Sequence, residues 1–181
     1  MTEETTLVSK LQQASTKEAA FRTLIAQYKE RLYWHIRKIV LSHDDTDDVL
    51  QNTFIKIFKS IDNFKGESKL YSWMYRIATN ESITFLNKKA KQNSVDISEY
   101  QQQMVSNLKS DDWFSGDEIQ LVLQKAIATL PQKQQLVFNM KYFDNMKYND
   151  ISEVLDTSVG ALKASYFHAV KKIEEYIKSY N

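Results

Sequence analysis

Residues 64–91 read FKGESKLYSWMYRIATNESITFLNKKAK, and this stretch decides the fold expected for the chain. A short polar loop around Gly66 leads into an uninterrupted run of helix-forming residues, so we expect a long helix from about Lys69 to Lys91. The predicted helix carries three aromatic residues near its start and lysines at its end. Aromatic faces beside cations are the elements with which proteins bind single-stranded nucleic acid. A core helix with a solvated basic end is the alternative interpretation.

The composition restricts the fold to a helical protein. The chain has 181 residues, of which only three are glycine and one is proline, so turn residues for a sheet protein are scarce. Apolar residues make up 43% of the chain, which is enough for one domain or two small ones. No cysteine is present, which excludes disulfide bonds and fits a reducing cytoplasm. The sequence shows neither a membrane span of roughly 18 apolar residues nor a signal-peptide core, so we expect a soluble, cytoplasmic protein.

The charges are unevenly distributed, although the formal net charge is only +1. Residues 56–91 carry eight basic and three acidic residues, whereas residues 92–118 carry one basic and six acidic residues. Residues 159–172 carry three lysines and no acidic residue. Clustered basic residues are the electrostatic footprint of nucleic-acid binding. Two basic segments separated by an acidic one therefore predict two nucleic-acid contacts.

The apolar periodicity predicts two small helical domains, an all-α fold. Ser15 followed by Glu18 is a capping-box signature, and apolar residues at helical spacing follow it over residues 21–40. A second amphipathic pattern covers residues 49–61. These two patterns and the long helix that begins near Lys69 make up the first domain.

A polar, acidic and weakly periodic stretch follows this domain, and we interpret most of it as a flexible linker. Trp113 and Phe114 are its apolar exceptions and are candidates for docking elsewhere. The predicted boundaries are an N-terminal segment at 1–16, a first domain at 17–91, a linker at 92–116 and a second domain at 117–181.

The second domain is predicted to hold four helices, of which the last two form a helix-turn-helix. A short amphipathic helix ends at Asp156, and aspartate tolerates the left-handed conformation of such a turn better than most residues. The next helix begins near Val159, and its outer face is small near the start and basic toward the end. This arrangement is typical of a helix that enters the major groove of DNA.

The motifs in these segments resemble those of a known protein family. DDVLQNTFIKIFKSIDNF at 47–64 and FKGESKLYSWMYRIATN at 64–80 are similar to domain two of the extracytoplasmic-function sigma factors, small members of the sigma-70 family. Residues 130–177 resemble the same family's domain four. The resemblance implies an alternative sigma factor that binds core RNA polymerase, directs it to the −10 and −35 promoter elements and nucleates promoter melting.

The resemblance also assigns residues to each contact. Asp48 and Gln51 lie three residues apart and therefore share a helix face, opposite the apolar Val49 and Leu50. The residues expected to bind the coiled coil of the largest polymerase subunit are Asp47, Asp48, Gln51 and Asn52. Those expected to bind the −10 element and its upstream duplex are Lys65, Gly66, Glu67, Ser68, Lys69, Asn80, Lys88 and Lys89. Those expected at the −35 element are Lys163, Ser165, Phe167, His168 and Lys171.

Neither a metal nor another cofactor is expected. The acidic cluster at residues 44–48 lacks the glycine and the terminal glutamate of a calcium loop, and the helix dipole accounts for carboxylates in a first turn. The chain shows no nucleophile–base pair or phosphate loop, so we expect no catalytic residue, no enzymatic activity and no small-molecule substrate. The resemblance implies core RNA polymerase, promoter DNA and an anti-sigma factor as partners, without direct membrane insertion.

Two other classes of function remain open. A helix-turn-helix regulator that binds operators without polymerase would have the same C-terminal domain, but it would leave residues 64–91 and the Asp48/Gln51 face unexplained. A purely structural helical protein or protein-binding module predicts no DNA binding and no effect of changing Lys163.

Overall fold

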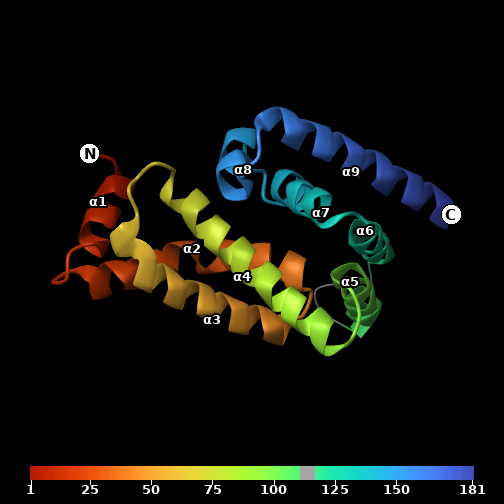
Figure 1. The fold of residues 1–181 in the computed structure, drawn as a ribbon, viewed down its shortest axis with the longest axis horizontal. Helices are drawn as coiled ribbons and strands as arrows, with labels where there is room; N and C mark the ends of the chain where they lie inside the picture. The colour runs from red at the N-terminus through yellow and green to blue at the C-terminus, as the bar shows by residue number, and fades with distance from the viewer. Residues whose placement is uncertain (111–116) are drawn as a thin grey trace.

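The computed structural model describes residues 1–110 and 117–181, and every regular element in these two ranges is a helix (Figure 1). The N-terminal bundle consists of α1 (Glu3–Leu11), α2 (Lys17–Val40), α3 (His43–Ser60) and α4 (Leu70–Gln92). The C-terminal bundle consists of α6 (Glu118–Ala128), α7 (Gln132–Phe138), α8 (Tyr148–Leu155) and α9 (Val159–Tyr180). Helix α5 (Ile97–Ser106) lies between the bundles in the chain. The prediction of an all-α fold is confirmed for the described residues.

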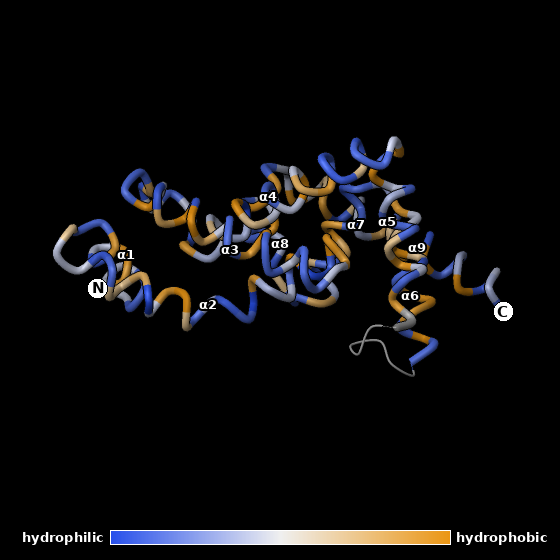
Figure 2. The backbone as a smooth tube through the Cα atoms, turned by 90° about the horizontal axis from the view of Figure 1, so that it is seen from below, coloured by the Kyte–Doolittle hydropathy of each residue, from blue (hydrophilic) through white to orange (hydrophobic). Residues whose placement is uncertain are grey.

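A tight turn folds α3 back against α2 and so begins the N-terminal bundle. Leu41 ends α2 in the left-handed conformation, with φ at 68°, and the side chain of Ser42 caps α3 by accepting from the amide of Asp45. Hydrophobic and hydrophilic residues then alternate along each helix, as amphipathic helices around a core require (Figure 2). The long helix α4 packs across both α2 and α3, which places Leu32 and Met74 at the centre of the core.

The chain before α2 is more ordered than its sequence predicts. Residues 3–11 form α1, which the apolar pattern does not reveal, and Leu11 is fully buried. The capping box expected from Ser15 and Glu18 is wrong, because Thr16 is the residue that precedes α2 and its side chain makes no cap hydrogen bond. The hydroxyl of Thr16 instead donates to the carbonyl of Lys10 at 2.7 Å, which closes the turn after α1.

The C-terminal bundle contains the predicted helix-turn-helix. Asp156 ends α8 in the left-handed conformation, with φ and ψ both at 50°, as expected for an aspartate at this turn. The side chain of Ser158 then caps α9 by accepting from the amide of Ala161 at 3.3 Å. A single π-helical turn, η3 (Asn139–Phe143), extends α7.

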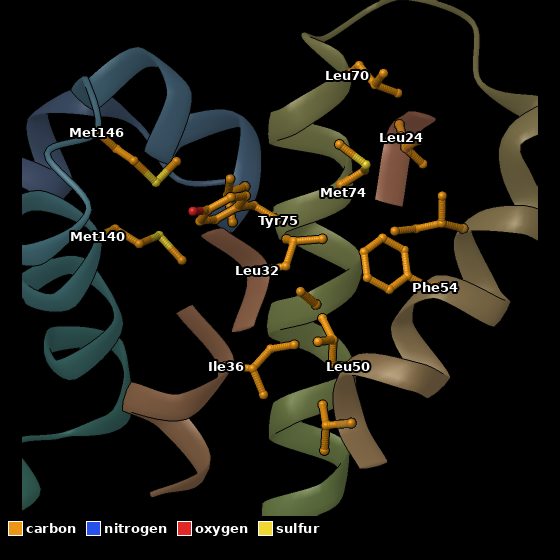
Figure 3. Packing of buried hydrophobic residues seen from close by; sticks show 14 of the residues in the cluster. Leu24, Leu32, Ile36, Leu50, Phe54, Leu70, Met74, Tyr75, Met140 and Met146 are labelled. Atoms are coloured by element: carbon orange, nitrogen blue, oxygen red, sulfur yellow. The ribbon is translucent and has the colours of Figure 1, made fainter. Parts of the chain in front are cut away.

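The two bundles share one apolar core. Met140 and Met146 point from the C-terminal bundle toward Tyr75 on α4 (Figure 3), and the three side chains are almost completely buried. Ile151 and Leu162 of the helix-turn-helix belong to the same cluster of buried residues. Figure 1 accordingly shows α8 beside the first half of α4, although the two helices are far apart in the chain. The bundles are therefore held together by apolar burial as well as by polar contacts.

In its described part, residues 92–110, the segment expected to be a flexible linker is largely helical. Within residues 92–116 the structure forms α5 and the short helix η2 (Asn107–Ser110). Tyr100 packs with residues of α2 and α4, and the side-chain amide of Gln101 donates to the carbonyl of Ile39 at 3.3 Å. Within α5, Tyr100 and Val105 are buried, a helical pattern that the low apolar content of the segment conceals in the sequence. Trp113 and Phe114 lie outside the described residues.

Candidate nucleic-acid interface

The outer face of α3 is acidic and exposed. Every residue predicted to bind polymerase is exposed there: Asp47, Asp48, Gln51 and Asn52. Val49 and Leu50 are buried on the opposite side, as predicted. Ile55 continues this face one turn further and is 46% exposed, which is unusual for isoleucine. The sequence analysis missed Ile55, although its place seven residues after Asp48 puts it on the same face.

The imidazole of His43 makes two polar contacts at the start of α3. His43 Nε2 lies 3.6 Å from a carboxylate oxygen of Asp47, and His43 Nδ1 is hydrogen-bonded to the hydroxyl of Tyr33 at 2.6 Å. No group of three or more potential metal-ligating side chains occurs in residues 1–110 and 117–181. The aspartates of this turn are best explained by the positive end of the α3 dipole.

The α3–α4 loop (residues 64–69) presents a left-handed glycine to solvent. Gly66 has φ at 72°, a conformation that side chains resist, and nothing lies within 4 Å of the position of a Cβ atom. Lys65, Glu67 and Lys69 are exposed. Phe64 anchors the base of the loop, because its ring is buried at 5.1 Å from the ring of Trp73.

Asp150 of α8 contacts this loop from the C-terminal bundle. Its carboxylate, 5% exposed, accepts hydrogen bonds from Lys69 Nζ at 2.8 Å and from the Tyr71 hydroxyl at 2.6 Å. Burial alone would raise the pKa of Asp150, but hydrogen bonds from Lys69 and Tyr71 lower that pKa below its usual value. The bond to Asp150 also raises the pKa of Lys69. A cation predicted to meet DNA is thus paired within the chain.

A second buried carboxylate, that of the residue directly after η3, also joins the bundles. Asp144 accepts from Lys38 Nζ at 2.5 Å and lies 3.4 Å from His35 Nδ1. The single hydroxyl proton of Thr79 goes to the carbonyl of Tyr75, so His35 Nε2 donates to the Thr79 oxygen at 2.7 Å. Burial acts to raise the pKa of Asp144, but His35 and Lys38 lower that pKa below its usual value. Neither aspartate was predicted from the sequence to contact the other bundle.

The remaining residues assigned to the −10 region lie far along α4 from the loop. Asn80 and Lys88 are exposed, and Lys89 Nζ lies 3.9 Å from a carboxylate oxygen of Asp45. Because α4 rises about 1.5 Å per residue, Lys88 lies roughly 27 Å from Leu70 along the helix axis. The structure therefore spreads these residues along one helix instead of gathering them into a pocket.

The predicted −35 surface lies on the outer side of α9. Lys163, Phe167 and Lys171 recur every four residues on one exposed strip, and Phe167 is 65% exposed. His168 is exposed beside this strip. Ser165 is only half-exposed and is rotated away from Lys163, because residues two apart in a helix do not share a face. The structure brings together four of the five predicted residues.

Comparisons with known proteins match both bundles to one family. Residues 24–92 match the family model for sigma-70 region 2, and residues 120–173 match the model for sigma-70 region 4. The chain is 29% identical over 182 residues to the ECF RNA polymerase sigma-E factor of Haemophilus influenzae, an alignment that covers 95% of this chain and 94% of that protein. The chain belongs to the extracytoplasmic-function sigma factors of the sigma-70 family. The corresponding sigma-E factor of Escherichia coli K12 is 26% identical over 95% of this sigma factor and 93% of its own length.

Solved structures share the fold of this sigma factor. CnrH, in complex with the cytosolic domain of CnrY, superposes with a TM-score of 0.70 over 97% of both chains at 18% identity. RpoE from Bartonella quintana, in complex with the anti-sigma factor NepR, superposes with a TM-score of 0.66 at 20% identity. That match covers 87% of this sigma factor and 96% of RpoE. In the part of the chain that the structure describes, no helix is long and apolar enough to cross a membrane.

Proposed function

We propose that this sigma factor binds core RNA polymerase through the outer face of α3 and reads two promoter elements with its two bundles. The observation that carries the proposal is the presence of two exposed basic surfaces on separate bundles. One is the α3–α4 loop, which turns at the left-handed Gly66, and the other is the outer face of the helix-turn-helix. Residues 17–91 would act as sigma domain two and residues 117–181 as domain four, with 1–16 and 92–116 as the N-terminal and connecting segments.

The α3–α4 loop would capture a base of the −10 element. Gly66 lets a nucleotide approach the backbone closely, Glu67 and Ser68 can hydrogen-bond a base edge, and Lys65 and Lys69 can bind phosphates. Further along α4, the exposed Asn80 and Lys88 and the half-exposed Lys89 would read the element and bind the upstream duplex.

The outer strip of α9 would meet the −35 element. Lys163, Phe167 and His168 are placed for the major groove, and Lys171 for a phosphate. Ser165 would also contact a phosphate, at the side of the helix rather than on the strip.

Promoter melting would depend on the polymerase. Stacking in duplex DNA averages about 1.4 kcal/mol per step, so opening roughly ten steps costs on the order of 14 kcal/mol. Capturing a base on an aromatic ring contributes only about 1–3 kcal/mol. One or two captured bases cannot hold the duplex open, so the sigma factor would nucleate melting while polymerase supplies the other contacts.

An anti-sigma factor is a further proposed partner, supported by CnrH and RpoE, whose solved structures are complexes with CnrY and with the anti-sigma factor NepR. The protein would act in the cytoplasm, where polymerase is found. A sigma factor is an initiation factor and not an enzyme, and the proposed role requires no cofactor.

The first experiment is a binding measurement with purified core RNA polymerase. We expect Asp48→Ala/Gln51→Ala to weaken binding at least tenfold, because loss of two or more hydrogen bonds at an interface removes about 1.4 kcal/mol or more. Glu99→Ala/Gln102→Ala is the matched control, since it also removes one carboxylate and one glutamine at the same spacing on the exposed face of α5. A folded wild-type protein that does not bind polymerase would refute the proposed function. Equal binding by the two double variants would refute the α3 assignment alone.

The −10 assignment has a separate test. Asn80→Ala or Glu67→Ala should change the preferred −10 sequence and leave polymerase affinity unchanged, because both side chains are exposed away from the polar face of α3. Initiation from a library of −10 sequences measures this preference. Unaltered preferences in both variants would remove these two residues from −10 recognition.

A further inference from the structure

The helix that follows the α3–α4 loop lacks a local cap. Lys69 stands at the position before α4, and its side chain makes no cap hydrogen bond. The first amides of a helix need partners from outside it. Leu70, the first residue of α4, donates its amide to Glu4 Oε1 at 3.0 Å. A carboxylate from α1 therefore caps α4 across 66 residues of sequence and also meets the positive end of its dipole.

The other end of the loop is held by the same N-terminal helix. Gln12, the residue that ends α1, donates from Nε2 to the carbonyl of Ile61 at 2.9 Å and to the carbonyl of Phe64 at 2.8 Å. A primary amide has two N–H groups, and Gln12 uses both on these carbonyls. The carbonyls belong to the first residue of η1 (Ile61–Asn63) and to the first residue of the loop.

These two anchors sit on a firmly packed element. Leu11 is fully buried in the cluster that also contains Phe64 and Leu70, and Leu7 and Val8 pack against it. Lys17 Nζ adds an ion pair to Asp62 at 2.8 Å. Between the anchors, the tip of the loop is exposed. Its shape therefore depends on how its two ends are fixed.

We propose that Glu4 and Gln12 are positioning residues for −10 recognition, an inference that rests on the proposed function. They touch neither polymerase nor DNA in this role. They hold the two ends of the α3–α4 loop at a set separation, so that Gly66 and Glu67 meet the base in the required shape. Ordering a loop costs conformational entropy, and a loop that is ordered in advance does not incur that cost on binding. The N-terminal segment thus becomes part of the promoter-reading site.

The chain supplies matched controls for each anchor. Gln12→Ala removes both hydrogen bonds to the loop carbonyls, whereas Gln13→Ala makes the same change at the next, exposed residue. Glu4→Ala removes the cap of α4, whereas Glu3→Ala removes an exposed carboxylate from the same turn of α1. Glu4→Gln is the conservative rescue, because its amide oxygen can still accept from the Leu70 amide.

The first readout is capture of a single-stranded −10 oligonucleotide by reconstituted holoenzyme. Each net hydrogen bond corresponds to about fivefold in an equilibrium constant, so we expect roughly fivefold weaker capture for Glu4→Ala and ten- to 25-fold for Gln12→Ala. Polymerase affinity and −35 duplex binding should stay within twofold of wild type. Glu3→Ala, Gln13→Ala and Glu4→Gln should resemble wild type in all three measurements.

The second readout does not depend on the proposed function. Amide hydrogen exchange of the full-length protein should become faster at Leu70 in Glu4→Ala, and faster in residues 61–69 in Gln12→Ala, but not in the matched controls. Unchanged exchange at these amides would overturn the inference, as would equal oligonucleotide capture by Gln12→Ala and Gln13→Ala. Parallel losses of −10 capture, polymerase binding and −35 binding would also overturn it, because they would indicate general unfolding. A wild-type holoenzyme that captured no −10 strand would refute the loop's proposed role, and this inference with it.

Discussion

The two candidate DNA-binding surfaces differ in what surrounds them. At the α3–α4 loop, Asp150 of the other bundle accepts hydrogen bonds from Lys69 and Tyr71. On α9, Lys163, Phe167 and Lys171 face solvent. A carboxylate that accepts from a lysine occupies the place that a DNA phosphate would take. The first surface is therefore partly engaged within the molecule, and the second is open.

We infer from this difference that the arrangement of the bundles on a promoter differs from the closed one. The −10 and −35 elements lie roughly 25 base pairs apart by their names, or about 85 Å along the DNA axis at 3.4 Å per base pair. Here the two bundles touch through a 2.8 Å ion pair and share an apolar core. We therefore expect them to separate when polymerase and promoter are bound, and the predictions below vary the contacts that oppose separation.

The largest effect is expected from Asp144→Ala. Lys38 and His35, with side chains 6% and 1% exposed, would be left buried without their carboxylate, which typically costs about 3–5 kcal/mol. We expect the bundles to move apart, measured as a larger radius of gyration by small-angle X-ray scattering and a lower free energy of unfolding. Glu174→Ala, which removes an exposed carboxylate from α9, is the control. An unchanged radius and stability in Asp144→Ala would show that the Asp144 contacts are not needed to close the molecule.

Asp150→Asn should weaken closure of the bundles less than Asp144→Ala does. It should also strengthen DNA binding at the loop. The side chain of Lys69 is 52% exposed, so solvent screens the pair and we expect only a small loss of closure. Freed of its ion pair, Lys69 should bind a single-stranded −10 oligonucleotide about fivefold more tightly in the protein without polymerase. Glu175→Gln on α9 is the control. Oligonucleotide binding by Asp150→Asn that is equal to or weaker than wild-type binding would refute the idea that Asp150 masks the loop.

Much of the fold follows from local sequence patterns. Ser42 marks the start of α3, Asp156 the turn of the helix-turn-helix, and Gly66 the left-handed turn of the loop, because each position requires a conformation or a cap that few residue types provide. The exposed face of α3 and the strip on α9 follow from helical periodicity in the same way. Local rules therefore predict which residues face outward on each helix.

The contacts between distant segments could not be predicted in this way. Glu4 meets Leu70, and Asp150 meets Lys69, only because tertiary packing brings together elements 66 and 81 residues apart. In the sequence Glu4 is one of several acidic residues near the N-terminus, and Asp150 is an ordinary first-turn aspartate. Helix α5 was missed for a related reason, since Tyr100 and Val105 find their partners on other helices.

The open surface on α9 predicts a change in salt dependence. Lys163→Ala/Lys171→Ala should weaken binding of −35 duplex and lower the slope of log affinity against log salt by about one unit, for the lost phosphate contact of Lys171. Lys65→Ala/Lys69→Ala, which removes two lysines of the α3–α4 loop, is the control and should leave the slope for −35 duplex unchanged. Titration of holoenzyme with labelled −35 duplex between low and high salt measures both slopes. An unchanged slope in the α9 variant would move the −35 contact to another surface.

The smallest effect within the physiological range is that of pH. Both bridging carboxylates, Asp144 and Asp150, have pKa values below the ordinary carboxyl value of about 3.9, because lysine and its neighbours stabilise their charged forms. A lowered pKa contributes stability that is present above the ordinary value and is lost as pH falls through the lowered one. The radius of gyration should therefore stay constant from about pH 8 to pH 5 and increase only below about pH 4. Asp144→Asn/Asp150→Asn should lack this acid step. An expansion that began near pH 6 in the wild type would contradict the assignment to carboxylates.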